Sequence, residues 1–495
     1  MAVMDAPAVP IQHPDSLFIG GRWVAPSSSS VIKVIDSGTE ELFFTVPEAQ
    51  APDIDRAVAA ARVAFDEGPW PRMTHAERAA FLRAFGREIG ERAETFGQIW
   101  PRQSGVVYSA AMAGIKTMPG IYDFYAGLAE TFPFEERVRP SAGEPFGMLV
   151  REPVGVVGAI IPWNGPLNLI TYKLAPALLS GCTVVLKAAP EAPGEAYVMA
   201  EIAEKIGLPE GVLNVVTADR EVSELLVRDP RVDKIAFTGS TVAGRRIASI
   251  MGERIGRVTL ELGGKSAAVV LDDIDLQKVA SVVSAAECRL TGQVCASLTR
   301  VVVSQHRHDE LVDALEGMFS QVVVGDPFAS DTQMGPLAMS RQRDRVEGFI
   351  AKGVEEGARL VTGGGRPKHL DRGYFVEPTV FANVENRSTI GQTEIFGPVL
   401  SVIPVANEAE AVRVANDTIY GLNSSIFTDD PDRAYDVARQ LRAGTVGGNG
   451  YRPDFGISFG GFKQSGIGRE GGTEGMHAYL EPKLIILDEV PAKFS

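Results

Sequence analysis

Short apolar segments alternate with segments of helical period between residues 154 and 271, and this alternation constrains the fold most. Each apolar segment is too short for a helix, and amphipathic stretches such as 194–206 and 242–251 separate them. Strands that alternate with helices predict a parallel sheet with helices on both faces. The apolar segments are VGVVGAII (154–161), TVVLK (183–187), VLNVV (212–216), KIAFT (234–238) and RVTLEL (257–262).

A second alternation of the same kind begins near residue 266 and runs past 445. A chain of 495 residues is too long for one hydrophobic core. We therefore predict an α/β protein with two doubly wound, Rossmann-like domains. The strands of the second domain include RVVVS (300–304), PVLSVIPV (398–405) and GTVGG (444–448).

The first 130 residues are expected to be largely helical after a short β start at LFIGGRWV (17–24). Apolar residues at helical spacing over 53–66 follow Asp53, which is a candidate N-cap. Thr74 and Glu77 form a capping-box pattern that would open a single helical run through residues 76–96.

Two segments outside the domains are predicted to be extended. Residues 133–152 are hairpin-like, with proline and glycine at the bend, and AYLEPKLIILDEV (478–490) is a strand that would leave an apolar edge exposed. Unpaired strand edges associate readily. We expect both segments to pair with another subunit of a homodimer or homotetramer.

The charge balance argues against several classes of partner, and the cysteine count bears on the compartment and on disulfide and zinc sites. A formal charge of -15, from 48 basic and 63 acidic residues, argues against nucleic acid or an anionic membrane. Residues 1–16 lack the features of a signal peptide, and the longest apolar stretch, 154–162, is about half the length of a membrane span. Three scattered cysteines fit a reducing compartment and neither a disulfide framework nor a zinc site. A cytoplasmic protein without a bound metal is expected.

Cys295, in TGQVCASLTR (291–300), is the candidate nucleophile. A cysteine is more often a buried structural thiol, which is our interpretation of Cys182 and, less firmly, of Cys288. Around Cys295, however, Gly292 permits close backbone approach and the following small residues leave room for a substrate. None of the six histidines occurs in a context that suggests a cysteine–histidine pair, so the base would be a carboxylate.

Glu261, in TLELGGKSA (259–267), is the candidate base. It ends an apolar strand, and apolar surroundings raise the pKa of a carboxyl group toward the range useful for general-base catalysis. A solvated glutamate at a strand end is an equally simple interpretation. A further pattern, IAFTGSTVAGRRIA (235–248), places glycines between a strand and a helix, where a helix N-terminus can meet a phosphate. Alone it is weak support for a dinucleotide site.

Eight motifs in order together resemble the aldehyde dehydrogenase superfamily, and the likeness extends from LFIGGRW to YLEPK. The resemblance implies an NAD(P)-dependent, hydrolytic aldehyde dehydrogenase. The motifs are PWNGPL (162–167), VVLK (184–187), FTGST (237–241), LELGGKS (260–266), GQVC (292–295), EIFGPV (394–399), NDTIYGL (416–422) and FGGFKQSGIGRE (459–470).

The resemblance also implies a domain organisation. Residues 1–132 and 153–260 would form the dinucleotide-binding domain, and residues 261–470 the catalytic domain. Residues 133–152 and 471–495 would form a small β oligomerisation element.

The implied mechanism assigns three catalytic residues. Cys295 would attack the aldehyde carbonyl to give a thiohemiacetal, and the Asn164 amide and the Cys295 backbone N–H would hold the oxyanion. Hydride transfer to the nicotinamide would leave a thioester, and Glu261 would activate the water that hydrolyses it.

The cofactor residues follow from the same resemblance. Lys187 would bind the adenosine ribose and Glu394 the nicotinamide ribose, while Trp163 and Phe396 would line the cleft or simply pack there. The other expected cofactor positions are Ile161, Pro162, Gly239, Ser240, Leu262 and Gly263.

Two departures from the family pattern bear on specificity. The glutamate usually found three residues after the ribose lysine is Pro190 here, and Glu191 comes one residue late, so NADP is a possible cofactor beside NAD. Gly165 replaces the bulky aromatic residue that often follows the oxyanion asparagine, which opens space of order ~100 Å³.

We therefore expect an apolar or bulky substrate, such as a medium-chain, terpenoid or aromatic aldehyde. The expected tunnel residues are Gly165, Val294, Ala296 and Phe455. The alternative is that Tyr451, Phe455 or Met112 fills the gap.

Two other functions share this fold. A coenzyme-A-acylating relative typically lacks the glutamate matched by Glu261, and an inactive structural relative would be expected to lack the thiol or the asparagine. Glu261, Cys295 and Asn164 are all present, which favours the hydrolytic enzyme.

Overall fold

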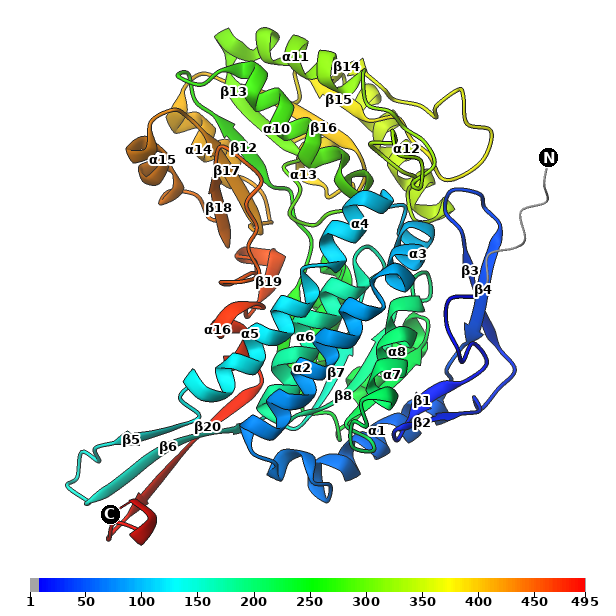
Figure 1. Ribbon diagram of the computed structural model, residues 1–495. Coiled ribbons are helices and arrows are strands. Elements are labelled where there is room, and N and C mark those ends of the chain that lie inside the picture. Colours follow the sequence, from blue (N-terminus) through cyan, green and yellow to red (C-terminus); the bar gives the residue numbers. More distant parts are fainter. Residues whose placement is uncertain (1–8, 495) are drawn as a thin grey trace.

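The computed structural model describes residues 9–494 (Figure 1). Residues 1–8 carry half of the segment on which the absence of a signal peptide was predicted, and that half lies outside the described residues. Within the described range, no helix has both the length and the apolar character that a membrane span requires.

The first sheet has eight strands in the order β19-β11-β10-β7-β8-β9-β1-β2. The five strands predicted between 154 and 262 are all present and pair in parallel, which confirms that prediction. They are β7 (Val156–Ile160), β8 (Thr183–Ala188), β9 (Leu213–Thr217), β10 (Lys234–Thr238) and β11 (Arg257–Glu261). The antiparallel strands at its two edges are β1 (Leu17–Ile19), β2 (Arg22–Val24) and β19 (Gly466–Ile467).

Helices cover both faces of this sheet because successive strand residues point to opposite sides. Val184 and Leu186 of β8 join one core, whereas Val185 joins the other. The first core is completed by α2 (His75–Glu91), α3 (Ala93–Ser104), α4 (Tyr108–Ile115), α5 (Met118–Thr131), α6 (Pro166–Ser180) and α7 (Gly194–Lys205). The second is completed by α1 (Ala51–Asp66), α8 (Arg220–Arg228) and α9 (Thr241–Glu253).

The second sheet has seven strands in the order β14-β15-β16-β13-β12-β17-β18, and it too is doubly wound. Ala267 and Val269 of β12 face one core, and Ala268 and Val270 face the other. Its strands are β12 (Ala267–Val270), β13 (Arg300–Ser304), β14 (Arg359–Thr362), β15 (Thr379–Ala382), β16 (Val399–Val405), β17 (Asn423–Phe427) and β18 (Thr445–Gly448). Its helices are α10 (Leu276–Cys288) and α11 (Gln305–Phe319) on one face, and α12 (Ser340–Glu355), α13 (Thr389–Gln392), α14 (Glu408–Asn416) and α15 (Pro431–Ala438) on the other.

A three-stranded sheet extends away from the two α/β layers, beside the C-terminus (Figure 1). The two extended segments predicted at 133–152 and 478–490 pair with each other, since β20 (Leu480–Leu487) lies antiparallel to β6 (Phe146–Pro153), which also pairs with β5 (Glu135–Val138). Leu484 of β20 is 56% exposed, and the three residues after it are also exposed. Pairing with another subunit stays a prediction.

Two local predictions in the N-terminal region are wrong. Gln50, not Asp53, is the N-cap of α1, and the Asp53 carboxylate accepts the Gln50 N–H at 2.9 Å from the third helical position. The run 76–96 is two helices, because the backbone leaves the helical conformation at Arg92. The capping box of Thr74 and Glu77 is confirmed.

The region also contains an unpredicted hairpin of β3 (Val31–Ile35) and β4 (Leu42–Pro47). The remaining short helices are α16 (Gly472–His477) and the 3₁₀ turns η1 (Trp70–Arg72), η2 (Arg289–Gly292), η3 (Lys463–Ser465) and η4 (Ala492–Phe494).

Candidate active site

One cavity of about 2240 Å³ lies between the two α/β halves. On one side it is lined by residues at the carboxyl ends of β7, β10 and β11, which is where parallel sheets bind ligands. On the other side it is lined by Cys295 and by Glu394. The cavity therefore joins chemistry-bearing residues from both halves.

A strained turn carries the chain from α10 to Cys295. Leu290, Thr291 and Gly292 have φ angles of 50°, 57° and 68°, in the left-handed region that non-glycine residues rarely adopt. The Thr291 hydroxyl holds the turn by donating to the carbonyl of Gly335 at 2.9 Å. A Cβ atom at Gly292 would overlap the main chain of Gly397, so only glycine fits there. Strain of this kind persists where the surrounding structure fixes the backbone.

The structure brings Cys295, Glu261 and Asn164 together around this cavity. The Asn164 side-chain nitrogen donates to the carbonyl of Gln293 at 2.9 Å, two residues before Cys295. A Cβ atom at Gly264 would overlap the carbonyl oxygen of Cys295, so the segment that follows Glu261 lies directly against the backbone of Cys295. The three residues thus share one site although they are far apart in sequence.

Burial disfavours the charged forms of both candidate reacting groups. Burial, with the charges of Glu394 and Glu261, raises the pKa of the Cys295 thiol to about 12. The pKa of Glu261 is raised well above its usual value, first by burial and then by the charge of Glu470. Neither oxygen of Glu261, which is 2% exposed, has a hydrogen-bond partner among residues 9–494. Such a carboxylate is a stronger base than a solvated one.

A buried ion pair beneath Glu261 was not predicted from the sequence. The Lys173 ammonium donates to Glu470 and to the hydroxyl of Thr238, each at 2.6 Å, and both charged side chains are almost fully buried. Glu470 also lines the cavity. It ends the motif FGGFKQSGIGRE, so the motif contained it, but no local pattern connects it to Lys173, 297 residues away.

Nine of the ten expected cofactor residues line the cavity. The exception is Gly263, where a Cβ atom would overlap the carboxylate of Glu394, so this glycine lies against Glu394 rather than on the cavity wall. The Gly264 N–H donates to Glu394 at 3.0 Å, and burial raises the pKa of Glu394 to about 7. The nine are Ile161, Pro162, Trp163, Lys187, Gly239, Ser240, Leu262, Glu394 and Phe396.

One part of the cavity wall combines a buried cation with a helix N-terminus. Lys187 is buried, its ammonium forms no hydrogen bond or ion pair with any residue that the structure describes, and burial lowers its pKa to about 8. Ser240 caps α9, and Gly239 and Ser240 line the cavity, so the helix N-terminus can receive a phosphate. Glu191 also lines the cavity, where it forms an ion pair with Arg341. This donor set fits a dinucleotide.

The four residues expected in a substrate tunnel, Gly165, Val294, Ala296 and Phe455, all line the cavity. Phe455 belongs to an aromatic stack, with ring centroids 4.3 Å from Tyr172 and 3.9 Å from Phe459.

The neighbour of Gly165 differs from the three residues suggested by the sequence. A Cβ atom at Gly165 would have only one heavy atom within 4 Å, Cζ2 of Trp100 at 3.8 Å. Met112 packs against Gly97 and is not among the residues that line the cavity. Trp100 is therefore the neighbour at the Cβ position of Gly165, and Tyr451 and Phe455 line the same cavity.

The other two cysteines differ in their surroundings. Cys182 is buried, donates to the carbonyl of Tyr479 at 3.5 Å, and has a pKa raised to about 11 by burial. Cys288 is 6% exposed and lies at the cavity wall, with its pKa raised to about 12 by burial. Within residues 9–494 no cluster of three or more histidine, cysteine, aspartate or glutamate side chains is arranged to hold a metal ion.

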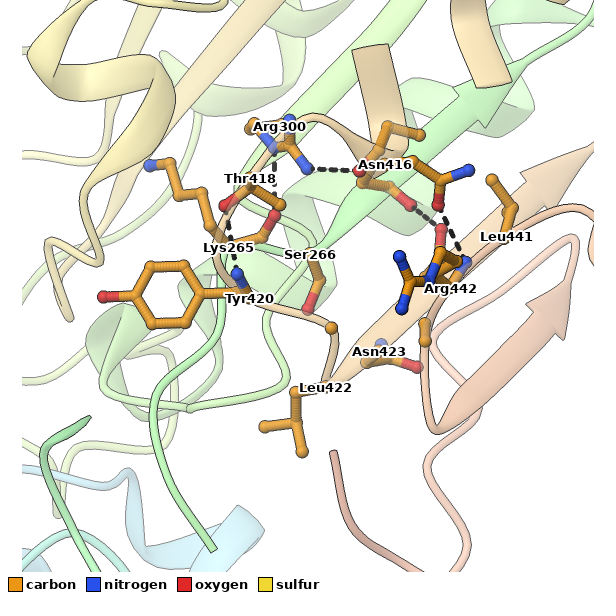
Figure 2. A pocket seen from close by; sticks show the side chains of 15 residues that line it. Lys265, Ser266, Arg300, Asn416, Thr418, Tyr420, Leu422, Asn423, Leu441 and Arg442 are labelled. Atoms are coloured by element: carbon orange, nitrogen blue, oxygen red, sulfur yellow. Dashed lines mark hydrogen bonds between the residues drawn. The ribbon is translucent and has the colours of Figure 1, made fainter. Parts of the chain in front are cut away.

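A second pocket, of about 20 Å³, lies beside β12 and β17 and is shown in Figure 2. Arg300 donates to the carbonyl of Lys265 at 2.9 Å, and the Arg442 N–H donates to the Asn416 side chain at 2.7 Å. The volume suits about one water molecule. None of the three cysteines lines this pocket, so the larger cavity is the candidate active site.

Comparison with known proteins identifies relatives over nearly the whole chain. A sequence profile described as the aldehyde dehydrogenase family matches residues 23–485. Geranial dehydrogenase of Castellaniella defragrans is 45% identical over 472 residues, covering 95% of this chain and 98% of the relative. The 3-succinoylsemialdehyde-pyridine dehydrogenase of a Pseudomonas species is 39% identical, with coverage of 95% and 98%.

Solved structures show the same fold. An aldehyde dehydrogenase of Mycobacterium tuberculosis in complex with NAD+ superposes with a TM-score of 0.93 at 45% identity, covering 96% of this chain and 98% of that one. A mutant aldehyde dehydrogenase C of Pseudomonas syringae, in complex with NAD+ and octanal, gives a TM-score of 0.93 at 37% identity and the same coverage.

Proposed function

The chain belongs to the aldehyde dehydrogenase family, and we propose that it oxidises an apolar or bulky aldehyde to the free carboxylic acid with NAD+. The observation that carries this proposal is the convergence of Cys295, Asn164 and Glu261 on one cavity whose other end suits a dinucleotide. Glu261 favours hydrolysis over transfer to coenzyme A, because it can activate water.

In the first half of the reaction, the Cys295 thiol passes its proton to water, its sulfur bonds to the carbonyl carbon, and the carbonyl π electrons move onto oxygen. The Cys295 backbone N–H and the Asn164 amide donate hydrogen bonds to this oxyanion. Asn164 has two amide N–H donors, and Gln293 engages one, so the other is available. Bound NAD+ would supply the two-electron oxidant for the hydride of the tetrahedral carbon, and Cys295 would then hold the acyl group as a thioester.

In the second half, Glu261 accepts a proton from water while the water oxygen bonds to the thioester carbon. The C–S bond then breaks, its electrons return to the Cys295 sulfur, and the carboxylic acid leaves. A buried carboxylate suits this step, because its raised pKa makes it a stronger base than a solvated carboxylate.

Four residues would hold the dinucleotide. Lys187 and Glu394 would bind the two riboses, and Gly239 with Ser240 would present the N-terminus of α9 to a phosphate. The fit is supported by the unpartnered ammonium of Lys187 and by the Gly264 N–H that orients Glu394.

The preference for apolar aldehydes is supported by the glycine at 165 and the aromatic stack of Tyr172, Phe455 and Phe459. Relatives named for geranial and crystallised with octanal point in the same direction. Residues 1–132 with 153–260 would form the cofactor domain and 261–470 the catalytic domain.

The β5–β6–β20 sheet supports assembly of a homodimer or homotetramer, because its apolar edge residues are exposed. A cytoplasmic location is supported by the three free cysteines.

The test is NADH formation by the purified protein with octanal, geranial, benzaldehyde and acetaldehyde. We expect turnover that Cys295→Ala abolishes and higher kcat/KM for the larger aldehydes. Glu261→Gln is expected to form NADH in a first turnover and then stop, because the thioester persists. A preference for acetaldehyde would refute the substrate class, and turnover by Cys295→Ala would refute the mechanism.

A further inference from the structure

Side chains of helix α3 donate hydrogen bonds to the turn that carries Asn164. The Trp100 indole N–H donates to the Asn164 carbonyl at 2.9 Å, and the Ser104 hydroxyl donates to the Trp163 carbonyl at 2.6 Å. Both carbonyls lie between β7 and α6, and neither accepts a backbone N–H from residues 9–494. Unpaired buried carbonyls are costly, so these side chains determine how the turn is held.

The same helix accepts a hydrogen bond from the segment before Cys295. The Gln293 side-chain nitrogen donates to the Ser104 carbonyl at 3.1 Å, and the Gln293 carbonyl accepts the Asn164 amide at 2.9 Å. The hydrogen bonds of Trp100, Ser104, Gln293 and Asn164 therefore form a closed network that includes α3. This hydrogen-bond network connects the oxyanion-binding amide to the backbone two residues before the nucleophile.

The Trp100 ring also forms a wall at the substrate end of the cavity. It lines the cavity and is 7% exposed. Cζ2 lies 3.8 Å from the Cβ position of Gly165, and Cζ3 lies 3.4 Å from the Cβ position of Gly114. Two glycines thus flank the indole, and it occupies part of the space beside Gly165.

We propose that Trp100 is both a positioning residue for Asn164 and the residue that sets the width of the substrate channel; this inference rests on the proposed function. The hydrogen bond holds the Asn164 main chain so that its amide meets the developing oxyanion in one geometry, which lowers the barrier to thiohemiacetal formation. The ring limits how wide an aldehyde can pass Gly165.

Two substitutions at Trp100 separate these roles. Trp100→Phe keeps a ring but removes the N–H, so the first-turnover rate of NADH formation should fall about threefold to tenfold for every aldehyde, with the KM ratios unchanged. Trp100→Ala also removes the wall, and should raise kcat/KM for a branched or ring-containing aldehyde relative to hexanal by about tenfold.

The matched control is Phe96→Leu, which alters a fully buried residue of the same helix outside the cavity. It should lower the melting temperature and leave the first-turnover rate and the aldehyde preference unchanged. Ser104→Ala provides a second test of the hydrogen-bond network. It removes the hydroxyl that donates to the Trp163 carbonyl and should also slow the first turnover.

Positioning by Trp100 is refuted if Trp100→Phe and Ser104→Ala lower the melting temperature, as Phe96→Leu does, but keep the wild-type first-turnover rate. The wall is refuted if Trp100→Ala keeps the wild-type order of aldehydes. Failure of the proposed function is a separate result, in which the wild-type protein itself forms no NADH with any aldehyde.

Discussion

Glu470→Gln is expected to destabilise the protein, because it removes one partner of a buried ion pair. The Lys173 ammonium lies 2.6 Å from Glu470, and the two side chains are 0% and 1% exposed. Removing one member of such a pair leaves the other charge buried without compensation, at a cost of about 3–5 kcal/mol. Glutamine preserves the shape and can still accept one hydrogen bond, so we expect the lower end, about 3 kcal/mol.

The same substitution is expected to change the pH dependence of hydrolysis. The negative charge of Glu470 raises the pKa of Glu261, second only to burial, and Lys173 acts in the opposite direction. Replacing Glu470 by a neutral amide while Lys173 stays charged therefore lowers the pKa of Glu261. A general base must be ionised to work, so the acid limb of the steady-state profile should move to lower pH.

Urea unfolding and a pH series of NADH formation test the two effects on the same proteins. Glu474→Gln, at an exposed carboxylate on α16, is the matched control and should change neither. The double variant Lys173→Met/Glu470→Leu removes both charges and should regain most of the lost stability. Wild-type stability in Glu470→Gln, or an acid limb that moves to higher pH, would show that this reasoning is wrong.

Three further outcomes follow from the site. Gly264→Ala should lower kcat by about 100-fold or more, because its Cβ would overlap the Cys295 carbonyl and displace the nucleophile, whereas Gly348→Ala, on an open face of α12, should leave kcat unchanged. The alkylation rate of Cys295 by iodoacetamide should rise steadily from neutral to alkaline pH, since burial raises its thiol pKa to about 12; a plateau near neutrality would contradict this. Glu191→Ala should raise the ratio of NADP+ to NAD+ turnover, because it removes a carboxylate whose negative charge acts on the Lys187 ammonium. Steady-state rates at equal cofactor concentration would measure this ratio. An unchanged ratio would show that another group repels the 2′-phosphate.

The α/β architecture could be predicted because its signals are local. A strand of five or six buried residues, most of them apolar, is visible in the sequence, and so is the capping box at Thr74. The β3–β4 hairpin was not predicted, although its strands VIKVI and LFFTVP are rich in apolar residues, because short apolar segments outside an alternating pattern do not reveal their pairing. The N-cap of α1 was wrongly assigned to Asp53. The first helical residue depends on backbone angles, and the side chains of several neighbouring residues influence those angles.

By itself, the sequence determined the order of strands and helices, the motifs around Cys295, Glu261 and Asn164, and the glycine at 165. Only the tertiary structure decided that Trp100 lies beside that glycine and that Lys173 pairs with Glu470. Contacts between residues 64 or 297 positions apart leave no periodic pattern, because they depend on how whole layers pack. The raised pKa values of Cys295 and Glu261 likewise arise mainly from burial, which the folded chain alone provides.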